Sequence, residues 1–191
     1  RFIGGHHIQA GSVTSRVDDS PGWRNYGTEL DRNWGELYQI QTDALAAWRT
    51  NPLARRIVGL TTDYVVGDGI SLDSEYAPLG SFIKRFWEHP RNQLALKLPA
   101  MCEELTRNGE LFPTLHFDVD GMAYVLVIPA SAVDQIHWTP GDYATETEYH
   151  ETVVGDLAGT WWKSPDHPDA NRVTALALHY AVNRPLGCVR G

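Results

Sequence analysis

The sequence predicts an α+β fold in which amphipathic helices precede an antiparallel, β-rich region. Over residues 26–109, apolar side chains recur at the spacing of one helix face. Residues 110–191 instead contain short apolar runs separated by turn-forming residues. Helices and strands therefore occupy separate stretches of the chain, which is typical of α+β proteins. Residues 1–25 are expected to be irregular, and 191 residues with 42% hydrophobic content suffice for one ordinary core.

Four helices are expected in the helical part. The first fills much of residues 28–49. The second has Asn51 as its N-cap and Pro52 in its first turn, where proline is well tolerated. It ends at Gly67 and Gly69, because glycine readily adopts the left-handed conformation that terminates a helix.

Apolar stripes predict which helix faces meet the core. The third helix has a stripe over residues 79–87 and stops at Pro90, and the fourth has one over residues 94–105 and closes at Asn108 and Gly109. The stripe expected to face the core from the second helix comprises Leu53, Ile57, Leu60 and Tyr64.

Strands are expected from residue 111 onward. The first two flank Asp120 and Gly121, a pair typical of a hairpin turn. The predicted strands cover residues 111–117, 122–128, 132–138, 146–154, 160–163 and 173–182.

The charge of the chain is −8 and is unevenly spread. Residues 110–169 contain eleven acidic side chains and one basic side chain, Lys163, which gives that segment −10 by subtraction. Proteins that grip nucleic acid need clustered lysine and arginine to displace counterions from phosphates. We therefore expect either no contact with nucleic acid or a surface past which DNA slides without adhering.

Apolar runs, cysteine content and the chain ends indicate the cellular setting of the protein. No stretch approaches the roughly 20 apolar residues of a membrane-spanning helix, so no membrane contact is expected. Two cysteines, Cys102 and Cys188, are too few for a disulfide framework and favour a reducing compartment. The first residues contain neither an initiator methionine nor a signal-peptide block, and Arg190 follows a strand-like segment closely. The chain is therefore expected to be a fragment of a longer protein.

Histidines and aspartates suggest metal sites, but their spacing argues against them. The eight histidines are scattered apart from the adjacent His6 and His7, and no helical pair or Cys-x-x-Cys pattern accompanies them. Solvated or core histidines are favoured, although a site assembled from distant residues stays open. Asp118 and Asp120 resemble the start of a calcium loop, but the position of its closing glutamate is Val127. A hairpin turn is the preferred interpretation.

Acidic and aromatic residues support one alternative, an intracellular hydrolase or carbohydrate-active domain. On a strand, Glu146 and Glu148 share a face, and paired carboxylates can divide acid and base roles. A strand with one solvated face shows the same pattern without catalysis, which is favoured here. The rings of Trp161 and Trp162 would point to opposite faces, leaving one for a subunit contact. No nucleophile elbow, phosphate loop or dinucleotide fingerprint is present.

Several phrases in fixed order carry a family resemblance. Asn-Pro-Leu-Ala-Arg-Arg-Ile-Val at 51–58 runs into Val-Val-Gly-Asp-Gly-Ile at 65–70, and Arg-Asn-Gly-Glu-Leu-Phe follows at 107–112. Ile-Pro-Ala occurs at 128–130, and a closing phrase spans 179–191. Together they resemble the N-terminal part of portal proteins of tailed bacteriophages of the lambda-like and HK97-like kind. The motif residues are Asn51, Pro52, Arg55, Arg56, Gly67, Gly69, Asn108, Gly109, Glu110, Arg190 and Gly191.

The resemblance implies a structural virion component and no enzyme. Portal proteins form a homo-oligomeric ring, usually a dodecamer, at one capsid vertex, and double-stranded DNA passes through its channel without sequence-specific binding. The ring docks the terminase large subunit, capsid and head–tail adaptor proteins, after assembly in the bacterial host cytoplasm. The present residues resemble the wing region, with stem, clip and crown lying elsewhere. The resemblance implies no catalytic, cofactor-binding or metal-ligating residue, and it identifies no DNA-contacting residue.

Overall fold

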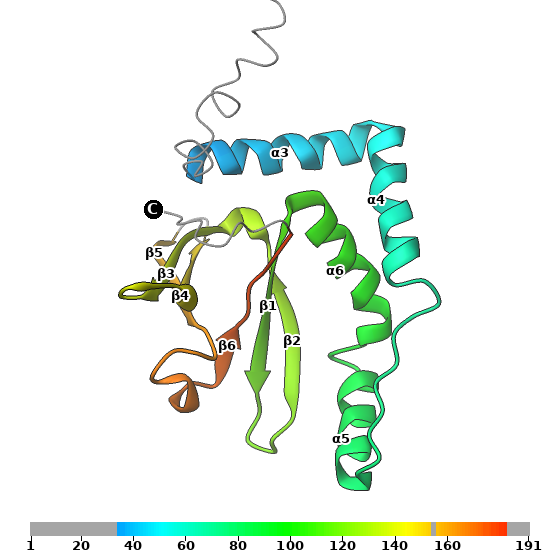
Figure 1. Cartoon of the computed structure of the whole chain (residues 1–191), viewed down its shortest axis with the longest axis vertical. Coiled ribbons are helices and arrows are strands. Elements are labelled where there is room, and N and C mark those ends of the chain that lie inside the picture. The colour runs from blue at the N-terminus through cyan, green and yellow to red at the C-terminus, as the bar shows by residue number, and fades with distance from the viewer. Residues whose placement is uncertain (1–33, 154–155, 183–191) are drawn as a thin grey trace, which may run out of the picture.

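The computed structural model describes residues 34–153 and 156–182 and has the predicted α+β fold (Figure 1). The predicted irregular segment 1–25 and the start of the first predicted helix lie outside the described residues. The helices are α3 (Trp34–Thr50), α4 (Pro52–Val65), α5 (Ala77–Glu88) and α6 (Leu94–Asn108). No helix in the described part has the length and hydropathy needed to span a bilayer.

Helix α4 begins and ends as its sequence predicts. The Asn51 side chain accepts a hydrogen bond from the Leu53 N–H at 2.9 Å, which satisfies one of the free donors of the first turn. Pro52 occupies the first helical position. At the other end Gly67 has φ +51°, the left-handed conformation expected of a helix stop.

The buried face of α4 differs from the predicted one. Leu53, Ile57 and Tyr64 are exposed, whereas Val58 and Thr62 are buried. The helix has apolar residues on two sides, and packing against α3 and α6 selects the side that carries Val58. Of the predicted stripe, Leu60 is half-buried, whereas the other three residues face solvent.

Helices α5 and α6 have the predicted stops. Helix α5 ends at Glu88, just before Pro90, and none of its side chains is fully buried. Helix α6 ends at Gly109, whose φ of +75° lets its N–H bond the Leu105 carbonyl oxygen at 2.8 Å. The apolar stripe of α5 is thus only partly covered by the rest of the fold.

Two antiparallel sheets follow the helices. One sheet has the strand order β2–β1–β6, with β7 also paired to β1, and the other has the order β3–β4–β5. Strands β4 and β5 each begin four residues before their predicted starts. The strands are β1 (Glu110–Phe117), β2 (Ala123–Ile128), β3 (Val133–Thr139), β4 (Asp142–Val153), β5 (Asp156–Lys163), β6 (Ala175–Ala177) and β7 (Tyr180–Ala181).

The predicted hairpin is confirmed and the last predicted strand is not. Strands β1 and β2 pair antiparallel around a turn in which the Gly121 N–H bonds the Asp118 carbonyl oxygen at 3.0 Å. Residues 173–182, predicted as one strand, instead form β6 and β7 with a break between them. The break covers residues 178–179, although both strands keep the same register against β1. The Leu178 N–H still donates to the Pro113 carbonyl oxygen at 2.9 Å, but Pro113 has no N–H to return a second ladder bond.

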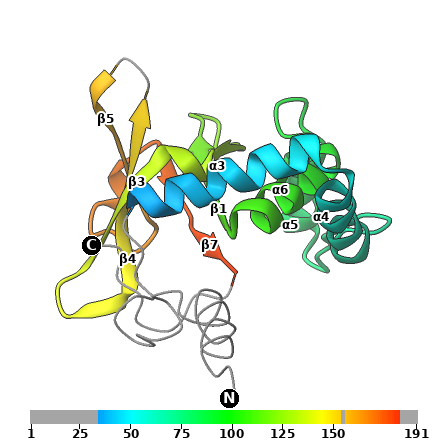
Figure 2. The same cartoon turned by 90° about the horizontal axis from the view of Figure 1, so that it is seen from above.

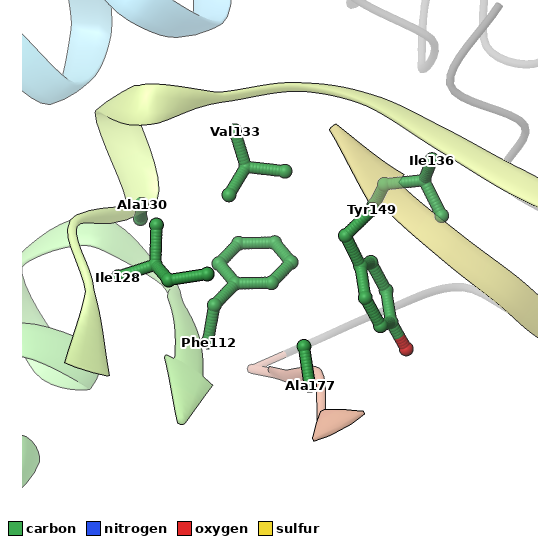
Figure 3. Close-up of a cluster of buried hydrophobic side chains, with 7 residues drawn as sticks. All are labelled: Phe112, Ile128, Ala130, Val133, Ile136, Tyr149 and Ala177. Atoms are coloured by element: carbon green, nitrogen blue, oxygen red, sulfur yellow. The ribbon is translucent and has the colours of Figure 1, made fainter. Parts of the chain in front are cut away.

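The hydrophobic core lies between the two sheets (Figure 3). Phe112 of β1 is fully buried, and its ring meets that of Tyr149 on β4 edge to face, with centroids 5.7 Å apart. Trp162 of β5 packs at the margin of this cluster. The buried members of the core are Phe112, Ile128, Ala130, Val133, Ile136, Tyr149 and Ala177.

Asn92 attaches the helical layer to the edge of the first sheet. It is completely buried between α5 and α6, and its side-chain N–H groups donate to the carbonyl oxygens of Phe86 at 2.8 Å and Ala123 at 3.0 Å. Its side-chain oxygen accepts from the Val125 N–H at 2.9 Å. Asn92 thereby bonds the edge of β2 as a neighbouring strand would. Helices α4, α5 and α6 consequently lie on the β2 side, away from β3–β5, whereas α3 runs across the molecule from α4 toward β3 (Figures 1 and 2).

We expect Phe112→Ala to lower the free energy of unfolding by about 3–5 kcal/mol, because it empties the centre of the core. Phe117→Ala, near the end of the same strand, is the matched control. Phe117 is 42% exposed, so its truncation should cost far less. Urea unfolding followed by tryptophan fluorescence measures both. Equal losses for the two variants would contradict this assignment of the core.

Candidate functional site

A buried polar cluster joins the two sheets. Glu146 of β4 is 7% exposed, and its carboxylate accepts a hydrogen bond from the Tyr149 hydroxyl at 3.0 Å. The Nδ1 atom of His179 lies 3.1 Å from Oε1 and 3.0 Å from Oε2 of the same carboxylate. An ionised carboxylate only accepts, so this geometry suits a proton on Nδ1 when Glu146 is charged. We call Glu146, Tyr149 and His179 the buried histidine cluster.

The first sheet holds the other side of His179. The imidazole stacks on the Phe112 ring, with centroids 4.4 Å apart and an angle of 4° between the planes. Its Nε2 atom is 4.0 Å from Oε1 of Glu110, the first residue of β1. Two acidic side chains from different sheets therefore flank one buried histidine. The arrangement links the sheets, and the imidazole ring is sequestered from solvent with its side chain 3% exposed.

Glu146 and Glu148 do not share a face, in contrast to the sequence-based expectation. Glu146 pairs with Trp138 and Glu148 with His137, with a register shift between these pairs. One extra residue on β4, Thr147, therefore lies in the bulge, and a bulge reverses the alternation of side chains. Glu146 points to the core and Glu148 to the opposite surface of the sheet. The geometric basis for a catalytic pair of carboxylates is thus absent at these two residues.

The outer surface of β3–β4–β5 carries histidines paired with carboxylates. Glu148 lies between two of them, with Oε2 at 3.4 Å from Nδ1 of His137 and Oε1 at 3.1 Å from Nε2 of His167. The indole of Trp161 stacks on His137 at 4.4 Å and tilts against His150 at 4.6 Å between centroids. Trp161 is exposed while Trp162 packs on the core, so the two rings point to opposite faces as predicted.

Hydrogen bonds from both ring nitrogens hold His150 in place on this surface. Its Nδ1 atom donates to Oδ1 of Asp134 at 2.5 Å, and its Nε2 atom donates to the Ala158 carbonyl oxygen at 3.2 Å. Both nitrogens thus face acceptors, which suits the doubly protonated ring. Burial lowers the pKa of His150, but these hydrogen bonds and the charge of Asp134 outweigh it, so the pKa lies above its usual value.

Gly159 provides the floor under the His150 ring. It has φ +59°, and a Cβ atom at this position would lie 2.5 Å from His150 Nε2 and 2.6 Å from the Glu151 carbonyl oxygen. Only glycine permits both the backbone conformation and this close approach. His116 of β1 meets the Trp162 ring edge to face at 5.6 Å, and burial followed by the nearby charge of Arg91 lowers its pKa.

A separate cavity of about 630 Å³ lies where α3, α6 and β2 meet. Its wall is largely apolar and includes Tyr38, Leu45 and Met101. The charged Glu104 at its edge is bonded to Arg107 and to the Asn108 side chain. The lining contains no member of the buried histidine cluster and neither Glu146 nor Glu148. The volume suits a small ligand, but no acid–base pair of the described residues converges on it.

The resemblance motif residues lie at structural joints. Asn51 and Pro52 start α4, and Gly67 and Gly69 have positive φ angles at its end. Arg55 stacks over the Trp48 ring at 5.1 Å, and Arg56 pairs with Asp63 at 3.8 Å. Asn108, Gly109 and Glu110 form the junction from α6 to β1. Arg190 and Gly191 lie outside the described residues.

The described residues contain no group of three side chains able to hold a metal ion. His6 and His7 are not among them. Sequence reasoning gave neither His179 nor Asn92 a structural role, although His179 begins the closing phrase 179–191. The only available signal for His179 was an imidazole within an otherwise apolar strand-like run.

We expect the stabilising effect of His150 to depend on pH. Because its pKa in the folded state is raised, the contribution is fully present below the unfolded pKa of about 6.5 and is lost as the pH rises through the folded pKa. The unfolding free energy of wild type minus that of His150→Gln should therefore be largest near pH ~5.5 and shrink by pH ~8. Asp134→Asn should remove most of this dependence, and a difference unaffected by pH would refute the assignment.

We expect Gly159→Ala to destabilise the fold by about 2–4 kcal/mol, since it combines a strained φ with a clash against His150 and Glu151. Gly121→Ala is the control, because Gly121 also has positive φ but no atom would lie within 4 Å of its new Cβ. It should cost only about 1 kcal/mol. The unfolding temperatures of the two variants distinguish the steric clash from the backbone strain. Equal decreases in unfolding temperature would contradict a close contact of residue 159 with His150 and Glu151.

Comparison with models of known protein families gives no match for this chain, and comparison with curated proteins gives none either. The resemblance of the motif phrases to portal proteins is therefore not supported by an overall similarity of sequence. The functional argument rests on the residues and their geometry.

Proposed function

We propose that this chain is part of the portal protein of a tailed bacteriophage, a non-enzymatic subunit of the ring through which double-stranded DNA enters and leaves the capsid. The carrying observation is the placement of the motif residues. Asn51 caps a helix, Gly67 ends it, and Gly109 and Glu110 turn α6 into the first strand. Residues that cap helices and form turns between elements are expected in a structural protein. Catalytic motifs instead bring their residues together at one site.

The distribution of charge supports this proposal. The segment 110–169 carries a net charge of −10, and it includes both the β1–β2 hairpin and the β3–β4–β5 sheet. A surface of this sign repels the phosphate backbone. It therefore favours a protein past which DNA moves over one that holds DNA in place. The partners proposed with this role are further copies of the chain, the terminase large subunit, and capsid and head–tail adaptor proteins in the virion.

The alternative of a hydrolase using Glu146 and Glu148 has no geometric observation in its favour. Glu146 is buried and bonded to Tyr149 and His179, while Glu148 faces the other side of the sheet between two histidines. Neither lines the cavity near α3. The contacts of Glu146 with Tyr149 and His179 support a structural role for this carboxylate.

We expect the protein, expressed from its complete open reading frame, to assemble into rings with a central channel. Size-exclusion chromatography followed by negative-stain electron microscopy and mass photometry tests this directly. A ring mass that is an integral multiple of the subunit mass, with twelve copies the family's usual number, is the expected result. Protein that stays monomeric across the accessible concentration range and shows no ring in the microscope would contradict the proposal.

A further inference from the structure

The cavity of about 630 Å³ is bordered by one face each of α3 and α6 and by the end of β2. Helix α3 contributes Gln41 and Leu45, which are one turn apart, and α6 contributes Ala100 and Met101. Val127 of β2 completes the apolar wall that Leu45 and Met101 begin. In Figure 1, α3 lies across the upper ends of α6 and β2. Cavities of this size with apolar walls and a few polar groups are the usual sites of small-molecule binding.

The side-chain amide of Gln41 is buried beside this cavity without a partner. Gln41 is 3% exposed, and its Nε2 atom has no hydrogen-bond partner among the described residues. The hydroxyl of Thr42, the next residue, instead donates to the Tyr38 carbonyl oxygen of its own helix. A buried donor without an acceptor loses its hydration and gains nothing in return, so native folds rarely contain one. An acceptor atom placed in the cavity would satisfy this amide.

Arg107 provides a second unsatisfied donor in the cavity lining. Its Nε atom is buried and has no hydrogen-bond partner in the described part of the chain. The rest of the guanidinium is held in place, because Nη2 donates to the Glu104 carboxylate and the group lies 5.1 Å from the centroid of the Trp48 ring. Both unsatisfied atoms are donors, so a ligand that satisfies them must supply acceptors.

The charges that line the cavity favour an anion. Three are basic and one is acidic, which gives +2 by subtraction: Arg49, Lys97 and Arg107 against Glu104. Glu104 is already paired with Arg107. The Lys97 ammonium donates to two uncharged backbone carbonyl oxygens, at 2.8 and 3.0 Å, which leaves one of its N–H groups. Neither Lys97 nor Arg49 forms an ion pair with another described residue, so their charges are not neutralised within the described fold.

We propose that this cavity binds a small organic anion that has an apolar body and one carboxylate. The apolar body packs against Leu45, Met101 and Val127, and its removal from water supplies affinity. The carboxylate accepts hydrogen bonds from the Gln41 amide and the Arg107 Nε–H, and its charge strengthens these bonds. The inference goes beyond the proposed ring function and does not depend on it, because the lining residues all belong to one chain.

A segment of another protein chain is the other occupant that an apolar groove suggests. The depth of the unsatisfied donors argues for a small molecule instead. Gln41 is almost completely buried, and the side chain of Arg107 is 13% exposed, so both donors lie below the surface of the protein. A small molecule can enter the cavity and reach them, whereas a packed protein surface covers only its mouth.

Calorimetric titration of the protein from its complete open reading frame tests this proposal. The probes are decanoate and cinnamate, one aliphatic and one aromatic carboxylate. At least one of them should bind once per chain with a dissociation constant below about 1 mM. Decanol and cinnamyl alcohol, which have the same apolar bodies without the charge, should bind roughly tenfold or more weakly, because hydrogen bonds to a charged group are stronger.

Four variants identify the site. Ala100→Trp places a large side chain at an exposed position of the lining and should abolish binding. Gln41→Leu removes the buried donor and Arg49→Met removes an unpaired charge, and each should weaken binding roughly three- to tenfold. Arg85→Met, the same charge change at an exposed position of α5 outside the lining, should bind like wild type. Thermal unfolding checks each variant, and Ala100→Phe or Gln41→Met replaces one that does not fold.

Methionine methyl NMR provides a readout of position. Met101 lines the cavity, whereas Met122 lies outside the lining, at the turn between β1 and β2. The methyl signal of Met101, assigned by its loss in Met101→Leu, should move during titration with the bound carboxylate. The signal of Met122, assigned in the same way with Met122→Leu, should stay in place.

Failure of both carboxylates to bind at millimolar concentration would overturn the inference. Equal affinity for acids and alcohols would overturn it as well, because the buried donors would then have no role. Binding that survives Ala100→Trp, with the Met101 signal unmoved, would place the ligand elsewhere. Loss of rings in Ala100→Trp without carboxylate binding to wild type would assign the cavity to a contact between subunits. Absence of rings from wild type bears only on the proposed function, so the two proposals can fail separately.

Discussion

The burial of the Glu146 carboxylate is the constraint on which the rest of the β region depends. A buried charge without partners costs several kcal/mol, so the fold must bring polar partners to it. The Tyr149 hydroxyl comes from the same strand, and the His179 imidazole comes from 33 residues away along the chain. His179 lies two residues after the buried Ala177, so the alternation of strand side chains places its imidazole on the inner face. The same ring stacks on Phe112, which couples this polar contact to the apolar core between the sheets.

A second polar device decides where the helices lie. The outer edge of β2 would expose backbone donors and acceptors, as any edge strand does. Asn92 and Lys97 bond these groups, with Asn92 reaching Ala123 and Val125, and the Lys97 ammonium donating to the Val125 carbonyl oxygen at 3.0 Å. The helical layer therefore covers one edge of the first sheet, and the second sheet packs on one of its faces. Helix α4 and the β3–β4–β5 sheet lie at opposite sides of the fold (Figures 1 and 2).

Apolar residues of α4 and α5 and the outer surface of the β region remain exposed in the described fold. Helix α5 has no fully buried side chain, and α4 turns its most apolar stripe to solvent. The β region carries most of the negative charge and presents an exposed tryptophan beside partly exposed carboxylates. Both surfaces are left exposed because other residues make the inward contacts: Val58 and Thr62 are the buried residues of α4, and Ile136 and Tyr149 belong to the core.

Signals between adjacent residues determined the helix boundaries, the β1–β2 hairpin and the α+β class, because a cap such as Asn51 or a left-handed stop such as Gly109 acts within a few residues. The tertiary structure alone decided which face of α4 is buried, since two apolar faces compete and distant helices choose between them. It likewise decided that Glu146 and Glu148 point apart, because a bulge depends on how β4 registers with β3. The contact of His179 with Glu146 also forms only on folding, because the two residues are far apart in the sequence. Local conformation is set by neighbouring residues, whereas burial and register are set by partners that only folding brings together.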